Sequence, residues 1–197
     1  MRKVNWIGLS SAASMLFILY MSLAHGAPWW RLEVGGSLGS VNVSPLDIEV
    51  KIMGSAIDVP LLGFVTFGSK VSWVIVAAMM LAYSLDLSPR NSGELLGFSY
   101  RKPTYYVVGM ILVGLVGRLV VGSFLPVEVP LVGVSTASFR FEGGTVSVPI
   151  RASITWVFWA AVVCAALSLG ARLCYEGSAT VKANLLRLRD PVAVPNV

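Results

Sequence analysis

Residues 57–64 read IDVPLLGF, and residues 127–134 read VEVPLVGV, so the second stretch repeats the first with mostly conservative exchanges. Each copy leads toward an apolar stretch. Those stretches also match, because residues 72–78 read SWVIVAA and residues 155–161 read TWVFWAA. Self-similarity of this kind predicts a duplicated helix–loop–helix unit. In a membrane protein such a duplication usually gives two related halves packed about an approximate symmetry axis.

The composition places the chain in a lipid bilayer. Of its 197 residues, 56% are hydrophobic and only 13% are charged, whereas soluble domains average about 25% charged. The mean hydropathy is +0.77. Apolar stretches near the ~20 residues that cross a bilayer lie at 6–23, 70–85, 104–125 and 154–171. We therefore predict a membrane α-helical fold with a bundle of four transmembrane helices.

The first stretch has an alternative interpretation as a signal peptide. Arg2 and Lys3 precede it, and Ser22-Leu23-Ala24 resembles a cleavage site. The apolar run is longer than the ~7–15 residues of a typical signal core. Cleavage would also leave the first half of the duplicated unit with one helix. We expect this span to be retained.

The distribution of Lys and Arg predicts the orientation, since cytoplasmic segments carry the excess. One side collects Arg2, Lys3, Arg90, Arg101, Lys102, Arg172, Lys182, Arg187 and Arg189, and the other has Arg31, Lys51, Lys70, Arg140 and Arg151. Both termini, the loop 86–103 and the tail 175–197 are then cytoplasmic. We predict a single integral domain over residues 1–197 in the cell membrane. The inner positive charge reflects topology and anionic lipid, with no indication of nucleic acid.

The outer segments, 26–69 and 126–152, are predicted to contain strands. Asp47–Met53 alternates strictly between polar and apolar residues, as a half-buried strand does. Trp30–Val34 and Ser40–Val43 flank a glycine-rich turn and are predicted as two further strands. We expect both outer segments to build one antiparallel β-sheet.

A hairpin is the sharpest local signal in the second outer segment. Phe139-Arg140-Phe141-Glu142 is followed by Gly143-Gly144 and then by Thr145-Val146-Ser147-Val148. We expect Phe141 opposite Val146 and Phe139 opposite Val148, on one apolar face. Because a lone hairpin is marginally stable in water, that face should pack on the first outer segment. The predicted contact residues are Ile48, Val50 and Ile52.

Arg118 is a charged side chain well inside the third predicted span, and buried charge in a bilayer indicates function by default. Gly114 and Gly117 fall on the same broad side of that helix, so Arg118 should face protein. Three interpretations remain open. Arg118 either reaches the outer interface and pairs with Glu128, Asp58 or a lipid phosphate, or contacts a partner subunit, or serves conduction.

The sequence shows no machinery for independent catalysis. Cys164 and Cys174 lie ten residues apart on one predicted helix, about 15 Å at helical rise, which is too far for a disulfide. His25 is the only histidine, so two-histidine haem or histidine–cysteine metal sites are excluded within the chain. No phosphate-binding loop, nucleophile motif or paired intramembrane carboxylate occurs. We therefore predict no enzyme activity, cofactor or small-molecule substrate.

Trp29 and Trp30 follow the first span directly, where tryptophan usually anchors a helix at the membrane interface. Four spans, inner termini and outer strands from a longer first and a shorter second loop resemble the claudin and PMP22 type of tetraspan protein. That family carries a Trp, a Gly-Leu-Trp and two cysteines in its first outer loop. Here only Trp29 and Trp30 correspond to that motif, and residues 26–69 contain no cysteine. The resemblance implies an outer sheet that mediates lateral or opposing contacts between proteins.

These features predict a non-enzymatic tetraspan protein that acts as a structural, assembly or accessory subunit. Its contact surfaces would be the outer sheet and small-residue helix faces, and its partner a second copy or another membrane protein. Candidate interface residues are Arg118, Gly114, Gly117, Trp29, Trp30, Phe139 and Phe141. The alternatives are a small transporter or channel subunit, and a cofactor-free subunit of a membrane enzyme complex.

The predicted orientation is testable by labelling. In a background lacking Cys164 and Cys174, a cysteine placed at Gly143 should react with an impermeant thiol reagent on intact cells, because the hairpin lies outside. A cysteine at Ser92 should stay unreacted until the cells are permeabilised. The opposite pattern would contradict the topology.

Overall fold

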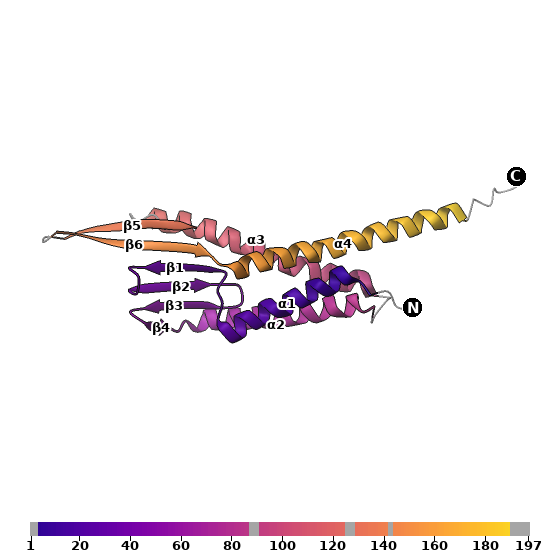
Figure 1. The fold of residues 1–197 in the computed structure, drawn as a ribbon, viewed down its shortest axis with the longest axis horizontal. Helices are drawn as coiled ribbons and strands as arrows, with labels where there is room; N and C mark the ends of the chain where they lie inside the picture. The colour runs from indigo at the N-terminus through magenta and orange to yellow at the C-terminus, as the bar shows by residue number, and fades with distance from the viewer. Residues whose placement is uncertain (1–3, 87–90, 125–128, 142–143, 190–197) are drawn as a thin grey trace.

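The structure, a computed structural model, describes residues 4–86, 91–124, 129–141 and 144–189. Four helices form a bundle with a β-sheet at one end, which we call the sheet end (Figure 1). All four are long and apolar enough to cross a membrane. They are α1 (Trp6–His25), α2 (Pro60–Ser84), α3 (Ser92–Phe124) and α4 (Trp156–Arg189).

The sheet is antiparallel and has six strands in the order β4-β3-β2-β1-β6-β5. The strands are β1 (Trp30–Val34), β2 (Gly39–Val43), β3 (Ile48–Ile52), β4 (Ser55–Ile57), β5 (Gly133–Phe141) and β6 (Gly144–Ile154). The three strands predicted in the first segment are confirmed to within a residue at each end. The short β4 was not predicted. It follows a tight turn in which Met53 and Gly54 both have positive φ.

The two loop segments form one sheet, as predicted, and they join through β1 and β6. Trp30 pairs with Ile154 and Val34 pairs with Ile150. The Thr155 amide donates to the Trp29 carbonyl at 3.0 Å, so the pairing continues into the start of α4. The expected packing of the hairpin face on Ile48, Val50 and Ile52 is wrong. Edge-to-edge pairing satisfies the backbone groups of β1, which face packing would leave open.

The hairpin register differs from the predicted one by two residues. Phe139 pairs with Val146 and Phe141 pairs with Gly144, which leaves residues 142–143 between the two strands. These two residues lie outside the described residues. Gly144, predicted as a turn residue, instead pairs with Phe141 and starts β6, with φ +150, a conformation that glycine adopts readily. A shift of two residues leaves every side chain on its predicted face.

The two copies of the repeated stretch adopt different structures. In the first, Pro60 begins α2, a position where its missing N–H costs nothing. In the second, Gly133 has φ +113 and begins β5, since this conformation cannot continue a helix. The helix α2 consequently starts ten residues before the predicted boundary at Lys70. Matching letters here do not mark equivalent positions in two halves.

The tryptophans of the two matching stretches, Trp73 and Trp156, also occupy different environments, although a duplicated unit would place them at equivalent positions. Trp73 lies in the middle of α2, is 0% exposed, and donates its indole N–H to the Met15 carbonyl of α1 at 2.9 Å. Its ring packs against Trp29 and Tyr106. Trp156 is the first residue of α4 and is 55% exposed.

Small residues let α1 approach its neighbours closely. A Cβ added to Gly8 would lie 2.5 Å from the Ser84 hydroxyl of α2. Between α1 and α4, the hydroxyls of Ser11 and Ser168 are hydrogen-bonded at 2.7 Å in the buried core. Ala12 and Ala161 are fully buried. The small residues of α1 and of this part of α4 are therefore used within the chain.

Like α2, the helices α3 and α4 extend well beyond their predicted spans. The helix α3 begins at Ser92, and Pro103 lies inside it. Pro103 is fully buried, so packing in the bundle offsets the ~3 kcal/mol that a proline costs inside a helix. The helix α4 continues to Arg189, well past the predicted end at residue 171.

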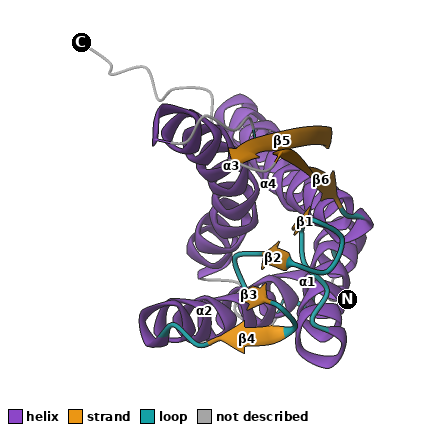
Figure 2. Ribbon diagram, turned by 90° about the vertical axis from the view of Figure 1, so that its left-hand side faces the viewer, coloured by secondary structure: helices purple, strands orange, loops and turns teal. Residues whose placement is uncertain are grey.

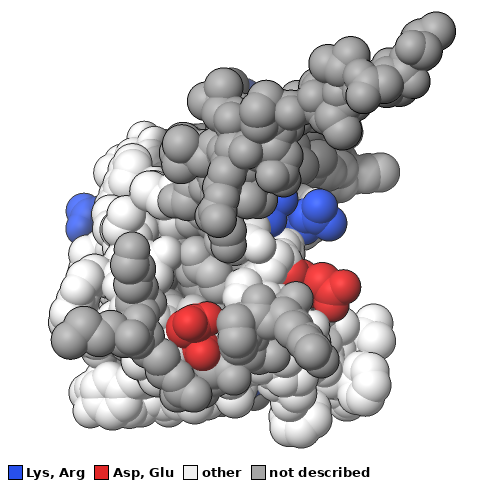
Figure 3. All heavy atoms as spheres, turned by 90° about the vertical axis from the view of Figure 1, so that its right-hand side faces the viewer, with Lys and Arg blue, Asp and Glu red and all other residues white. Residues whose placement is uncertain are grey.

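The end of the bundle opposite the sheet carries charges of both signs (Figure 3). The charged residues there include Arg101 and Lys102 of α3 and Arg172 of α4, as well as Asp86 after α2 and Glu94 at the start of α3. Other basic residues predicted for this end, such as Arg2, Lys3 and Arg90, lie outside the described residues. The predicted positive excess at this end therefore stays a prediction.

One face of the sheet carries a polar row that crosses three strands. The Arg31 side chain donates to Asn42 at 3.2 Å, Asn42 donates to Glu49 at 3.0 Å, and Lys51 pairs with Glu49 at 2.7 Å. The hydrogen bonds from Lys51 and Asn42 lower the pKa of the Glu49 carboxyl. The opposite face is apolar, with Leu32 paired to Val41 on one side and to Ala152 on the other.

The contrast between the two tryptophans gives a stability prediction. Trp73→Ala removes a fully buried aromatic side chain, which costs ~3–5 kcal/mol in soluble cores. Trp156→Ala, at an exposed position in the matching stretch, should change stability by less than ~1 kcal/mol. Thermal unfolding in one detergent measures both. Equal losses would show that the two positions are equivalent after all.

Candidate functional site

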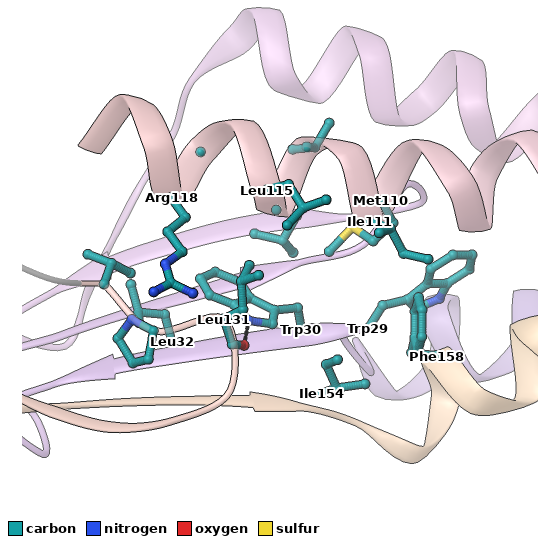
Figure 4. Close-up of a pocket in the computed structure, with 16 residues that line it drawn as sticks. Trp29, Trp30, Leu32, Met110, Ile111, Leu115, Arg118, Leu131, Ile154 and Phe158 are labelled. Atoms are coloured by element: carbon teal, nitrogen blue, oxygen red, sulfur yellow. Dashed lines mark hydrogen bonds between the residues drawn. The ribbon is translucent and has the colours of Figure 1, made fainter. Parts of the chain in front are cut away.

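The second half of α3 passes over the apolar face of the sheet without packing on it. The helix packs against α2 and α4, and among the described residues it makes no extensive contact with any strand. Between α3 and the sheet lies a pocket of about 470 Å³ (Figure 4). Its volume is within the range of about 300–1,000 Å³ that small-molecule sites occupy.

Three parts of the chain form the walls of this pocket. The sheet and its flanks contribute Trp29, Trp30, Leu32, Val43, Ile154 and Phe158. The helix α3 contributes Met110, Ile111, Val113, Gly114, Leu115, Gly117 and Arg118. The segment before β5 closes one side with Val129, Pro130 and Leu131. Except for Arg118, none of these residues carries a charge.

The Arg118 side chain extends from α3 toward the closing segment (Figure 4). Among the described residues no acidic group pairs with it, Asp58 included. Glu128, the other predicted acidic partner, lies outside the described residues. Arg118 also borders a second cavity of about 390 Å³, whose walls include Ser135. The guanidinium thus stands where the apolar pocket meets a more polar recess.

The closing segment is held in place by Trp30. The indole N–H of Trp30 donates to the Leu131 carbonyl at 2.7 Å. The Leu131 side chain in turn lies 3.1 Å from the point where a Cβ on Gly114 would be. The absence of a side chain at Gly114 therefore lets Leu131 close over α3. The indole N–H is the only donor of the Trp30 side chain and is used in this bond. Trp30 therefore contributes only the apolar surface of its ring to the pocket.

Trp29 is a core residue as well as a pocket wall. It is fully buried, and its ring makes edge-to-face contacts with Trp73 and Phe158. Its indole N–H has no acceptor among the described residues. The expected anchoring of Trp29 at the membrane surface is therefore wrong, because neighbouring aromatic side chains enclose it.

Five of the seven predicted interface residues border this one pocket: Trp29, Trp30, Gly114, Gly117 and Arg118. The other two, Phe139 and Phe141, lie in β5, away from it, and their side chains are outside the described residues. Sequence reasoning missed Met110, Leu131 and Phe158. Leu131 falls in the repeated stretch, but nothing in that repetition indicates that it would cover a glycine.

The part of the chain that the structure describes contains few other groups of side chains that could form a metal site or a disulfide. No group of three or more His, Cys, Asp or Glu side chains there has an arrangement suited to a metal ion. Cys164 is buried and Cys174 is exposed, and the two are not bonded to each other, as predicted.

Comparison with protein families, with characterised proteins and with solved structures finds no match to this chain. The function is therefore inferred from the residues and their arrangement.

Proposed function

We propose that this chain is a non-enzymatic multi-pass membrane protein that works by contact, as a structural, assembly or accessory subunit. The observation that carries the proposal is the β5–β6 hairpin, which reaches far beyond the other strands (Figure 1). The strand β6 pairs with β1 only from Ile150 to Ile154. Residues 144–149 consequently have β5 as their only partner strand among the described residues.

Among the described residues β6 is the only strand that pairs with β5, so the other edge of β5 near Ser138 has no neighbouring strand. Pro149 has no N–H, and its carbonyl accepts from the Gly35 amide at 2.8 Å, on the side away from β5. Thr136 and Pro149 therefore form a non-hydrogen-bonded pair. Because such pairs alternate along an antiparallel ladder, the backbone N–H and C=O of Ser138 also point away from β6.

Apolar side chains accompany this edge. Val134 on β5 is 63% exposed and Val146 on β6 is 54% exposed. An exposed strand edge with apolar neighbours is a template for a strand from another chain. The hairpin is thus suited to bind a neighbouring protein or a second copy by strand addition.

The helix α3 offers a second surface. In each helix we compare the apolar stretch of 18 residues that is long enough to cross a membrane. Only 11% of this stretch is buried within the chain in α3, against 28–33% in the other three helices. Gly109 on this helix has no atom of the rest of the chain within 4 Å of an added Cβ. A small residue on an uncovered helix lets a neighbouring helix approach closely, which supports contact within the bilayer.

The proposal includes location and orientation. We place the protein in the cell membrane with both termini in the cytoplasm and the sheet outside, on the strength of the Lys and Arg distribution. Contact between proteins through an outer sheet is also what the resemblance to the claudin and PMP22 type implies.

A proline at the free edge tests strand addition. Ser138→Pro removes an amide that points away from β6, so the β5–β6 ladder stays intact while a docking strand loses a hydrogen bond. We expect this variant to release chains that co-purify with the wild type in mild detergent, or to dissociate an oligomer. Mass spectrometry and light scattering measure these two outcomes.

Ser138→Ala is the matched control, because it removes the hydroxyl that lies 3.4 Å from Ser147 yet keeps the backbone amide. The control should behave as the wild type. Identical assembly of all three proteins, or a wild type that is monomeric and alone, would contradict the proposed contact function.

A further inference from the structure

We propose that the pocket between α3 and the sheet binds one anionic membrane phospholipid. One of its two acyl chains would lie along α3, and its phosphate would lie on Arg118. The lining of this site includes neither a β5 residue nor Gly109, so the inference does not depend on either of the proposed contact surfaces.

The pocket needs an apolar occupant. The apolar face of β1 and the second half of α3 border the same space without packing on each other. The two surfaces therefore leave apolar area uncovered, and a hydrocarbon chain would cover both at once. Met110 and Arg118 are eight residues apart on α3, about 12 Å at helical rise, which gives the pocket an elongated wall.

The pocket is open to its surroundings. Ile111 and Leu115, two of its lining residues, are 48% and 45% exposed. None of the lining residues comes from α2, which packs against α3 elsewhere in the bundle. An acyl chain therefore has access to the pocket from the bilayer without any separation of packed helices.

At the end of the pocket away from Met110, Arg118 provides a positive charge. It is the only charged residue of the lining, and no acidic group of the described residues neutralises it. A guanidinium binds a phosphate through two parallel hydrogen bonds. The cavity beside Ser135 offers space for the rest of a headgroup next to the guanidinium. Charge and shape together fit an amphiphile with an anionic head.

A transmembrane helix of a partner fits the pocket less well. Packed helices have axes 8–10 Å apart, so a partner would need the glycine surface of α3 free. Leu131 already lies over Gly114 and is held there by the bond to Trp30. Space of this size, closed on one side by Leu131, suits a flexible chain better than a helix.

The test uses the full-length protein in mild detergent, washed free of lipid and titrated with phosphatidylglycerol. Native mass spectrometry counts bound lipids, and circular dichroism checks folding. The wild type should bind one lipid per chain with saturation. Arg118→Leu should weaken binding by about tenfold or more, since a hydrogen-bonded charge is lost. Arg118→Lys should lie between the wild type and Arg118→Leu, since lysine keeps the positive charge but loses the two parallel hydrogen bonds.

Filling the pocket provides an independent variant. Gly117→Leu places a side chain in the pocket from a position with no atom within 4 Å of its Cβ, so it should abolish binding without disturbing the helix. Gly97→Leu, on the same helix and equally open but outside the pocket and away from the proposed contact at Gly109, is the matched control and should bind as the wild type does.

Several results would overturn the inference. Absence of saturable lipid binding by the wild type, or unchanged affinity in both Arg118→Leu and Gly117→Leu, would exclude this pocket as the site. If glycerol phosphate, which has the headgroup but no acyl chain, bound with the same affinity as phosphatidylglycerol, the pocket would be an anion site and not a lipid site. A co-purifying membrane protein that Gly117→Leu releases, with no lipid bound, would identify a partner helix as the occupant.

Discussion

The pairing of β1 with β6 is the constraint on which the rest of the structure depends. The strand β1 follows α1 after a short turn, and β6 leads directly into α4, so their register also determines how the sheet ends of these two helices meet. The Thr155 hydroxyl donates to the Pro28 carbonyl at 2.5 Å, so the contact between the two chain segments continues beyond the paired strands toward α1 and α4. With this pairing in place, β5 becomes an edge strand. The closing segment before β5 must then cross beneath α3, which creates the pocket. Figure 2, a view from the sheet end, shows the strands following one another from β4 near α2 to β5 near α3.

Much of the architecture was predictable because it follows from local physical rules. Four apolar stretches of bilayer length indicated four helices, and strict alternation in Asp47–Met53 indicated β3. The helix limits were less accurate. Packing decides them, as shown by the buried Pro103 inside α3 and by Lys70, which pairs with Asp47 at 3.5 Å from within α2. The repeat was the most misleading signal. The sequences around Pro60 and Pro130 are similar, but the first leads into the helix α2 and the second into the strand β5.

The candidate site was predictable only as a set of residue types. Arg118 drew attention as a charge in an apolar span, and Gly114 and Gly117 as small residues near it. Their grouping with Trp30 depends on a contact between segments about a hundred residues apart, the hydrogen bond from Trp30 to the Leu131 carbonyl. No local pattern encodes such a contact. The same limit explains Trp29, whose position after a membrane span indicated an interface anchor, whereas tertiary packing encloses it.

The pairing of β1 with β6 can be measured directly. In a background lacking Cys164 and Cys174, cysteines at Glu33 and Arg151 occupy directly paired positions, with Cα atoms about 5.5 Å apart in such a ladder. This separation lies within the range of about 4.4–6.8 Å that disulfides span, whereas the diagonal combination of Glu33 with Ser153 exceeds it. Oxidation in native membranes should cross-link the first pair and leave the second unlinked. Efficient cross-linking of the diagonal pair, or of neither, would contradict the joint sheet and with it the placement of the pocket.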